Sequence, residues 1–143
     1  MAYATRSDIE AIYQPELLVR IAYDRAAGEV DDNLVAAALN YASALIDSRL
    51  SQRYTLPLDP VPQIINGYCV DLAIYRMALT RDKLTQEMRQ RYEDAVADLR
   101  DIAAGKAGLG NPTINPDTGS ASVSGGLDVN NARARICISR RRG

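Results

Sequence analysis

The chain has 143 residues, of which 47% are hydrophobic and 24% are charged, and its formal net charge is −1. This length is typical of one domain that buries its own apolar core. A nearly neutral chain is not a general nucleic-acid binder by charge alone. No apolar run approaches the roughly 18 residues of a membrane span, and the first residues lack an apolar signal-peptide segment. We therefore expect a cytosolic protein without membrane contact.

The residue types that are missing or rare exclude several kinds of catalytic and metal site. There is no His, so catalysis by His and metal binding by His are excluded. The two cysteines, Cys69 and Cys137, are far apart and form no CxxC pair, which argues against a four-cysteine zinc site or a disulfide framework. We expect no catalytic, cofactor or metal site, and we do not expect an enzyme.

Two short helices are predicted first. Ser7, with Glu10 three residues later, forms a capping-box pattern and predicts a helix over residues 8–13. The residue before a proline avoids the helical region, so this helix should end before Pro15. Pro15 then suits the first turn of a second helix over residues 15–22.

A longer third helix is predicted after a loop over residues 24–28. Asp31 or Asp32 should cap it, because a carboxylate suits the positive end of the helix dipole. The helix is expected over residues 33–54, where there is neither Pro nor Gly. Apolar residues recur in it at spacings of three and four, namely Leu34, Ala38, Tyr41, Leu45 and Ile46.

The segment of residues 56–62 holds three prolines and predicts a stiff, extended crossover. A fourth helix should follow, from about residue 61–63 to Thr80. It is apolar over a wide arc, which predicts a central helix or one buried against a partner chain. Gly67 within it suggests a close helix crossing. Asp71 and Arg76 interrupt the apolar surface and predict a salt bridge to a neighbouring helix, with a subunit contact as the functional alternative.

A fifth helix is predicted over residues 86–104, capped by Thr85 and stopped by Gly105. Beyond it, residues 109–131 are rich in Gly, Asn, Ser, Thr and Pro, which predicts a flexible arm. The arm ends in a basic segment whose apolar alternation could form a short strand against a sheet edge. We therefore expect an all-α fold: a bundle of four to five helices over residues 1–108, and an arm over residues 109–143.

Charge divides unevenly between these parts. Residues 1–109 hold 12 basic and 16 acidic side chains, whereas residues 110–143 hold five basic and two acidic ones. An acidic body with a basic arm suits docking of the arm on a neighbour.

Candidate chemical motifs are weak. Three carboxylate pairs fall on a helix cap or a solvated helix face, where general acid–base chemistry is not expected: Asp31/Asp32, Glu93/Asp94 and Asp98/Asp101. The segment from Asp24 to Asp32 lacks the alternating ligands of a calcium loop. The glycines of residues 105–110 follow a helix, whereas a phosphate cradle opens one. Cys69 is expected to be a small buried apolar residue.

An ordered set of short stretches carries a family resemblance. It comprises Tyr3-Ala4-Thr5-Arg6-Ser7-Asp8, Ala42 to Leu50, Arg53-Tyr54-Thr55-Leu56-Pro57-Leu58, Val61-Pro62, Cys69 to Ala73, and Arg91 to Ala95. Together these resemble a family of small virion proteins from tailed phages and Mu-like prophages, whose members look like head–tail connector (adaptor) proteins. The family often ends in an Arg-apolar-aromatic-Ser-Arg stretch. Residues 135–140 are similar but lack the aromatic residue.

The resemblance implies a helical protomer that assembles as a homo-oligomeric ring below the portal, with twelve-fold symmetry among the arrangements it allows. Expected partners are the portal protein and a tail or stopper protein, and DNA would pass through the channel without sequence-specific binding. The expected location is the neck of the virion, and the host cytoplasm during assembly. The expected contact residues lie in the proline segment and the arm: Leu56, Pro57, Leu58, Pro60, Arg133, Arg135, Ile136, Ile138, Arg140 and Arg141.

Two alternatives remain open at this stage. A small helical DNA-binding or packaging-accessory module would need a basic face on the helices, yet the body is net acidic. An enzyme or its accessory subunit would need a pocket with convergent polar groups, which the sequence does not indicate.

Overall fold

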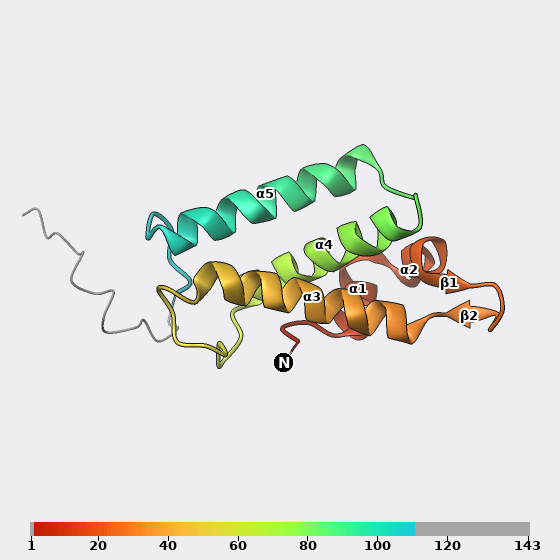
Figure 1. Ribbon diagram of the computed structural model, residues 1–143, viewed down its shortest axis with the longest axis horizontal. Coiled ribbons are helices and arrows are strands. Elements are labelled where there is room, and N and C mark those ends of the chain that lie inside the picture. Colours follow the sequence, from red (N-terminus) through yellow and green to blue (C-terminus); the bar gives the residue numbers. More distant parts are fainter. Residues whose placement is uncertain (1, 111–143) are drawn as a thin grey trace, which may run out of the picture.

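A computed structural model describes residues 2–110 (Figure 1). The expected helical body is confirmed, and a small two-stranded hairpin joins its second and third helices. The elements in chain order are α1 (Arg6–Tyr13), α2 (Pro15–Ala22), β1 (Tyr23–Asp24), β2 (Glu29–Val30), α3 (Asp32–Leu50), α4 (Gln63–Thr80) and α5 (Gln86–Ala103).

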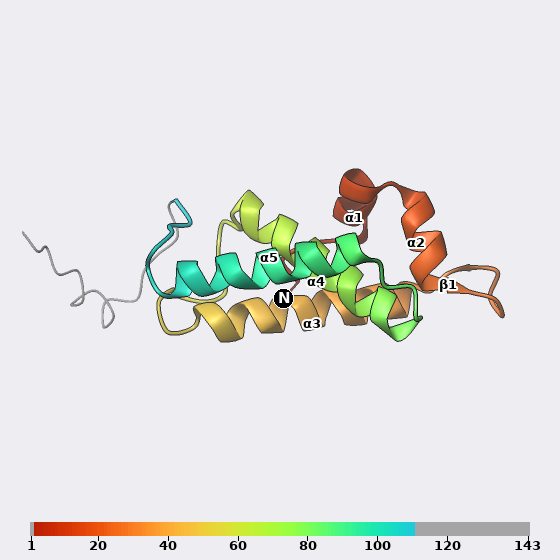
Figure 2. The same ribbon diagram turned by 90° about the horizontal axis from the view of Figure 1, so that it is seen from above.

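The helix α4 is the centre of the body, as its wide apolar arc predicted. It packs against α1, α2, α3 and α5. Figures 1 and 2 show α3, α4 and α5 lying alongside one another, with α1 and α2 gathered toward the hairpin. The buried residues of α4 are Ile65, Cys69, Val70, Leu72, Ala73, Ile74, Met77 and Ala78. Contacts on several sides explain why so few of its positions are polar.

Three predicted helix ends are confirmed by their hydrogen bonds. The Asp31 carboxylate accepts from the backbone N–H of Asn33 and Leu34 at 3.0 and 3.1 Å, which caps α3. The Thr85 hydroxyl accepts from the N–H of Met88 at 3.3 Å and caps α5. After α5, Gly105 adopts a positive φ of 80°. This left-handed residue ends the helix, as glycine commonly does.

The start of α1 was predicted two residues too late. The helix begins at Arg6, with Thr5 as its N-cap. The Asp8 carboxylate accepts from the Thr5 N–H at 2.7 Å, whereas Glu10 pairs with Arg6 at 2.8 Å. Thr5 and Asp8 have the spacing of a capping box, and this pair opens the helix in place of Ser7 and Glu10.

The end of α3 was predicted four residues too late. The helix ends at Leu50, whose carbonyl accepts from the N–H of both Arg53 and Tyr54, at 3.0 and 2.9 Å. This turn carries the chain inward, and Tyr54 is buried. Burying the Tyr54 ring stabilises the fold by more than the helix propensity of the preceding residues would if the helix continued.

Two predictions about α4 were wrong. Gly67 does not mark a close helix crossing, because a Cβ placed there would meet no atom within 4 Å. Asp71 and Arg76 form no salt bridge within residues 2–110. The Asp71 carboxylate accepts a hydrogen bond from Tyr13, and the Arg76 guanidinium lies 4.0 Å from the centre of the Tyr41 ring. Tyrosines on neighbouring helices satisfy both charged groups instead.

The expected loop after α2 is a hairpin turn. Tyr23 pairs with Val30 and Asp24 with Glu29 in antiparallel register. The Asp24 carboxylate accepts from the N–H of Ala26 at 2.8 Å, and Gly28 supplies the left-handed residue with a φ of 75°. Within residues 2–110, none of the helices combines the length and the apolar character needed to cross a bilayer.

Candidate interaction surfaces

The three long helices separate two ends of the body. Each has 18 or 19 residues, which corresponds to about 27 Å at 1.5 Å per residue. The turn and proline segment between α3 and α4, together with the chain after α5, form one end, which we call the loop end. The hairpin and the turn between α4 and α5 form the other, the hairpin end (Figure 1).

The predicted contact residues of the proline segment divide into inner and outer positions. Leu58 is 3% exposed and belongs to the core, and Leu56 is half-buried against it. Pro57 and Pro60 are exposed. Leu58 is therefore an anchor of the segment, and the surface that this protomer offers is made by the two prolines and part of Leu56.

Tyr3 fastens the proline segment to the body. The ring is 4% exposed, its hydroxyl donates to the Asp47 carboxylate, and the N–H of Leu58 donates back to that hydroxyl at 3.4 Å. The Tyr3 backbone is held as well, since its N–H donates to Ser43 at 3.0 Å and its carbonyl accepts from the Asn66 side chain at 3.1 Å. Burial, and then the hydrogen bond to Asp47, raises the pKa of Tyr3 to about 12. A lone tyrosine before the first helix carries no sequence period that would have predicted this role.

The predicted contact residues of the arm lie outside the described residues, namely Arg133, Arg135, Ile136, Ile138, Arg140 and Arg141. So do the predicted terminal strand and Cys137. The described chain reaches Gly110 at the loop end, and Leu109 is 8% exposed against the core. Leu109 therefore packs on the helical body next to the predicted boundary at 108.

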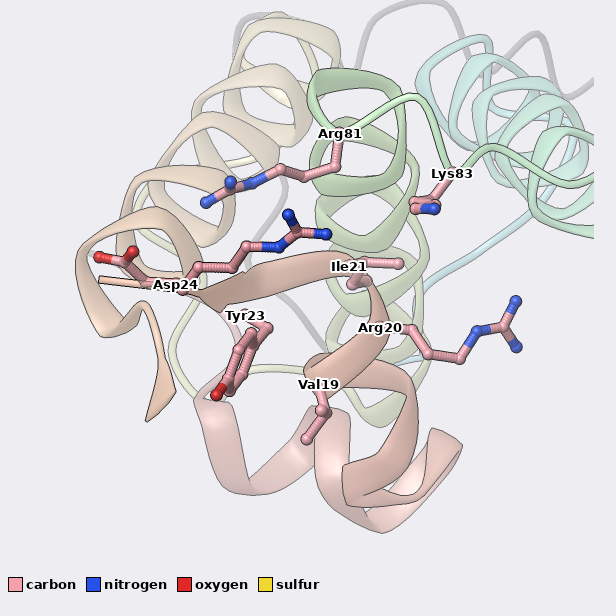
Figure 3. Close-up of a pocket in the computed structure, with 8 residues that line it drawn as sticks. Val19, Arg20, Ile21, Tyr23, Asp24, Arg81 and Lys83 are labelled. Carbon is pink, nitrogen blue, oxygen red and sulfur yellow. The ribbon is translucent and has the colours of Figure 1, made fainter. Parts of the chain in front are cut away.

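A hollow of about 490 Å³ lies at the hairpin end, and we call it the basic hollow (Figure 3). Figure 3 shows Arg81 and Lys83 on the side of α4, with Val19 and Tyr23 across from them. Its lining residues are Val19, Arg20, Ile21, Tyr23, Asp24, Arg25, Arg81 and Lys83. No sequence pattern predicts this hollow, because its cations come from two segments about 60 residues apart along the chain.

The four cations of the basic hollow are exposed. Within residues 2–110, the ion pairs involve Arg6, Arg91 and Lys106, and none involves a cation of the hollow. Asp24 is the one carboxylate of the lining, and it already accepts from a backbone N–H in the hairpin turn. The hollow is therefore a concentration of positive charge open to an anionic group.

A polar cluster ties α1, α4 and α5 together away from either end. The Tyr13 hydroxyl donates to Asp71 and accepts from Arg91 at 3.1 Å, and Arg91 also pairs with Glu87 at 2.9 Å. Burial raises the pKa of the Asp71 carboxyl, while the Tyr13 hydrogen bond and the Arg91 charge oppose that rise. The same burial and the contact with Asp71 raise the pKa of Tyr13. These contacts account for the cluster as a structural link between helices.

Two of the three carboxylate pairs named above serve separate local roles. Asp31 caps α3, and Asp32 pairs with Arg6. Asp98 accepts from the Tyr68 hydroxyl at 2.8 Å, and Asp101 lies 3.7 Å from the Lys106 ammonium group. None of these four lines the basic hollow.

The matches to known proteins cover nearly all of the described body. The family described as Bacteriophage Mu, Gp36 matches residues 3–125. The chain belongs to this family. It is 34% identical over 128 residues to the Mu-like prophage FluMu protein gp36 of Haemophilus influenzae, which covers 87% of this chain and 89% of that protein. It is 33% identical over 111 residues to gene product J of Escherichia phage Mu, which covers 77% of each chain.

Membership of the Gp36 family confirms the expected relation to Mu-like phages, and the protein is a phage protein of this kind. The family match includes both ends of the described body, with the proline segment and the basic hollow. It stops at residue 125, before the predicted contact residues of the arm.

Proposed function

We propose that this Gp36-family protein is a head–tail connector, a structural virion protein that joins the head at its portal to the tail. In this proposal it works as a homo-oligomeric ring around the DNA channel, without catalysis. Its partners are the portal protein on one side and a tail or stopper protein on the other. Its location is the neck of the virion, after assembly in the host cytoplasm.

One observation of the body carries this proposal. Two surfaces of different chemistry lie at opposite ends of helices about 27 Å long. The loop end presents Pro57 and Pro60 on a segment that Tyr3 and Leu58 hold in place, and the hairpin end presents the basic hollow. A ring protein contacts both its own copies and other virion proteins, and two such surfaces held at a fixed separation suit these two kinds of contact.

The first experiment is the mass of the purified full-length protein by light scattering over a range of concentrations. A ring-sized oligomer, or one that forms at high concentration, supports the connector. Co-purification with the portal protein of the same phage is the second readout, since a portal can template a ring that does not form alone. A protein that stays monomeric and does not bind the portal contradicts the proposal.

The arm gives a second test of the same function. Deletion of residues 110–143 should leave the helical body folded, because the buried side chains described here lie before this point. The truncated protein should lose docking to the virion partners, since the arm holds five basic and two acidic residues and would pair with an acidic neighbour. If circular dichroism shows that the truncated protein unfolds, the arm belongs to the core and this assignment fails.

The basic hollow favours one alternative, a DNA-binding or packaging-accessory module. Four cations with no ion pair inside the described body could contact phosphates. A shift of duplex DNA that weakens steeply with salt, and that Arg81→Glu with Lys83→Glu abolishes, would support this module. Absence of such a shift in the wild-type protein would favour the connector.

A further inference from the structure

We infer that the basic hollow receives the acidic C-terminal half of α5 from a second copy of this chain. This inference rests on the proposed function, since it specifies the contact between neighbouring subunits of the ring. It assigns a partner to the hollow, whose cations make no ion pair with another described residue.

The first support is the charge of the hollow. Arg20, Arg25, Arg81 and Lys83 lie around one cavity with one carboxylate among them. Cations gathered in this way repel one another, so the arrangement does not stabilise an isolated protomer. An anionic partner that enters the hollow turns the same repulsion into attraction.

The second support is the position of the acidic residues on α5. Glu93, Asp94, Asp98 and Asp101 fall within its last eleven residues, against one cation of the same stretch, Arg100. Asp94, Asp98 and Asp101 contact Gln90, Tyr68 and Lys106 within the protomer. Glu93, Asp94 and Asp98 nevertheless remain exposed, so this half of α5 presents an acidic surface to a neighbour.

The charge of the whole body agrees with a second copy as the partner. The described residues hold twelve basic and sixteen acidic side chains. The hollow takes four of the basic side chains and one of the acidic ones, so eight basic side chains face fifteen acidic ones elsewhere. A second copy of the chain is thus a predominantly acidic surface, except at the hollow itself.

The placement of the two surfaces permits a head-to-tail contact. The helix α5 begins at the hairpin end and runs to the loop end, so its acidic half lies away from the hollow of its own protomer. Each copy can then offer a hollow to one neighbour and an acidic helix to the other. Such heterologous contacts close into rings when the rotation between copies fits, whereas a two-fold dimer would need one self-complementary patch.

The rim of the hollow favours a protein over a nucleic acid. Val19 and Tyr23 are 49% and 40% exposed beside the cations. Interfaces between proteins combine such aliphatic and aromatic groups with charge, while backbone binding of duplex DNA relies on cations and polar groups. Fifteen acidic side chains over the rest of the described body also repel a phosphate backbone.

A charge-exchange experiment tests the pairing. One full-length variant carries Arg81→Glu and Lys83→Glu in the hollow, and a second carries Glu93→Lys and Asp94→Lys on α5. All four positions are exposed, so both variants should keep the wild-type circular dichroism spectrum. The control carries Arg49→Glu and Arg89→Glu, which change the net charge as much as the first variant but lie outside the hollow. Light scattering, over the concentrations at which the wild type assembles, is the readout.

We expect each charge-exchange variant alone to need at least about tenfold more protein to assemble, because like charges then meet at the contact. The control should assemble as the wild type does. An equimolar mixture of the two variants should recover assembly, since the acidic hollow of one meets the basic helix of the other. Recovery in the mixture is the result that a general charge effect or a folding defect cannot produce.

Four results overturn the inference. Assembly of the hollow variant at the wild-type concentration excludes the hollow, and failure of the mixture to recover excludes α5 as its partner. If the wild type shifts duplex DNA in a salt-sensitive way and the hollow variant does not, while both have the same oligomeric mass, the hollow binds nucleic acid instead. A wild-type protein that is monomeric at every concentration overturns the contact between copies as well. In that last case binding to the portal still decides the connector proposal separately.

Discussion

The two ends of the body differ in where their polar groups find partners. At the loop end, the Tyr3 hydroxyl, the Asp47 carboxylate and the N–H of Leu58 satisfy one another within the protomer. At the hairpin end, four exposed cations surround a hollow without an ion pair among the described residues. Internal satisfaction of buried groups gives stability, whereas exposed charge without a partner contributes little to it and remains available for binding. The contacts that stabilise the fold and the exposed charge that is available for binding thus lie at opposite ends of the helices.

The largest expected effect tests the loop end as a structural anchor. Leu58→Ala should lower the free energy of unfolding by about 3 kcal/mol, since it removes a buried leucine and leaves a cavity. The side chain is 3% exposed in the core. Urea unfolding followed by circular dichroism measures the change.

Val61→Ala in the same segment is the matched control, because Val61 is 40% exposed. It should change stability by less than about 1 kcal/mol. Equal effects of the two substitutions would mean that the segment does not anchor the loop end, and the contrast between the two ends would fail there.

A smaller loss is expected from Tyr3→Phe. The variant keeps the buried ring but removes the hydroxyl that donates to the charged Asp47 and accepts from Leu58. A buried hydrogen bond to a charged group contributes about 2 kcal/mol, and the same unfolding experiment should show a loss of that order. Tyr41→Phe is the control, since Tyr41 is 44% exposed and stacks under Arg76 through its ring alone. A loss no greater for Tyr3→Phe than for this control would contradict the anchoring role.

The dependence of stability on alkaline pH is a further test of the anchoring role of Tyr3. Burial raises the pKa of Tyr3 from 10.0 to about 12, so the folded state holds this proton more tightly than the unfolded state does. Its contribution to stability is complete below pH 10 and is lost as the pH rises through about 12. Tyr68, whose pKa burial also raises to about 12, adds to the fall. Stability measured against pH should therefore fall less steeply in Tyr3→Phe than in the wild type, and parallel curves would exclude Tyr3 as a contributor.

Periodicity and end signals predicted the helical body well. The span of α4 and the caps Asp31 and Thr85 followed from local rules that operate within a few residues. The end of α3 did not, because burial of Tyr54 against distant parts of the chain decides where that helix stops. The partners of Asp71 and Arg76 likewise depend on tyrosines of other helices, Tyr13 and Tyr41, which no local pattern identifies.

The candidate surfaces were predicted less completely than the fold. The proline segment stands out in the sequence, but the division between buried Leu58 and exposed Pro57 requires the packing of Tyr3. The basic hollow carries no run of charge, since α2 and the hairpin supply Arg20 and Arg25 while Arg81 comes from the turn after α4. Such a site forms only when the folded chain brings distant segments together. The composition argues against a basic site, because the body as a whole is acidic.

The smallest expected effect on stability is at the hairpin end. Arg81→Ala together with Lys83→Ala should change the free energy of unfolding by less than about 0.5 kcal/mol, because both side chains are exposed and make no ion pair with another described residue. Relief of repulsion among the remaining cations would make that small change favourable, and the gain should shrink as salt screens the charges. Urea unfolding at low and high salt measures both quantities. A loss as large as that of Tyr3→Phe would mean that these cations hold the protomer together, and the contrast between the two ends would then be wrong at the hairpin end.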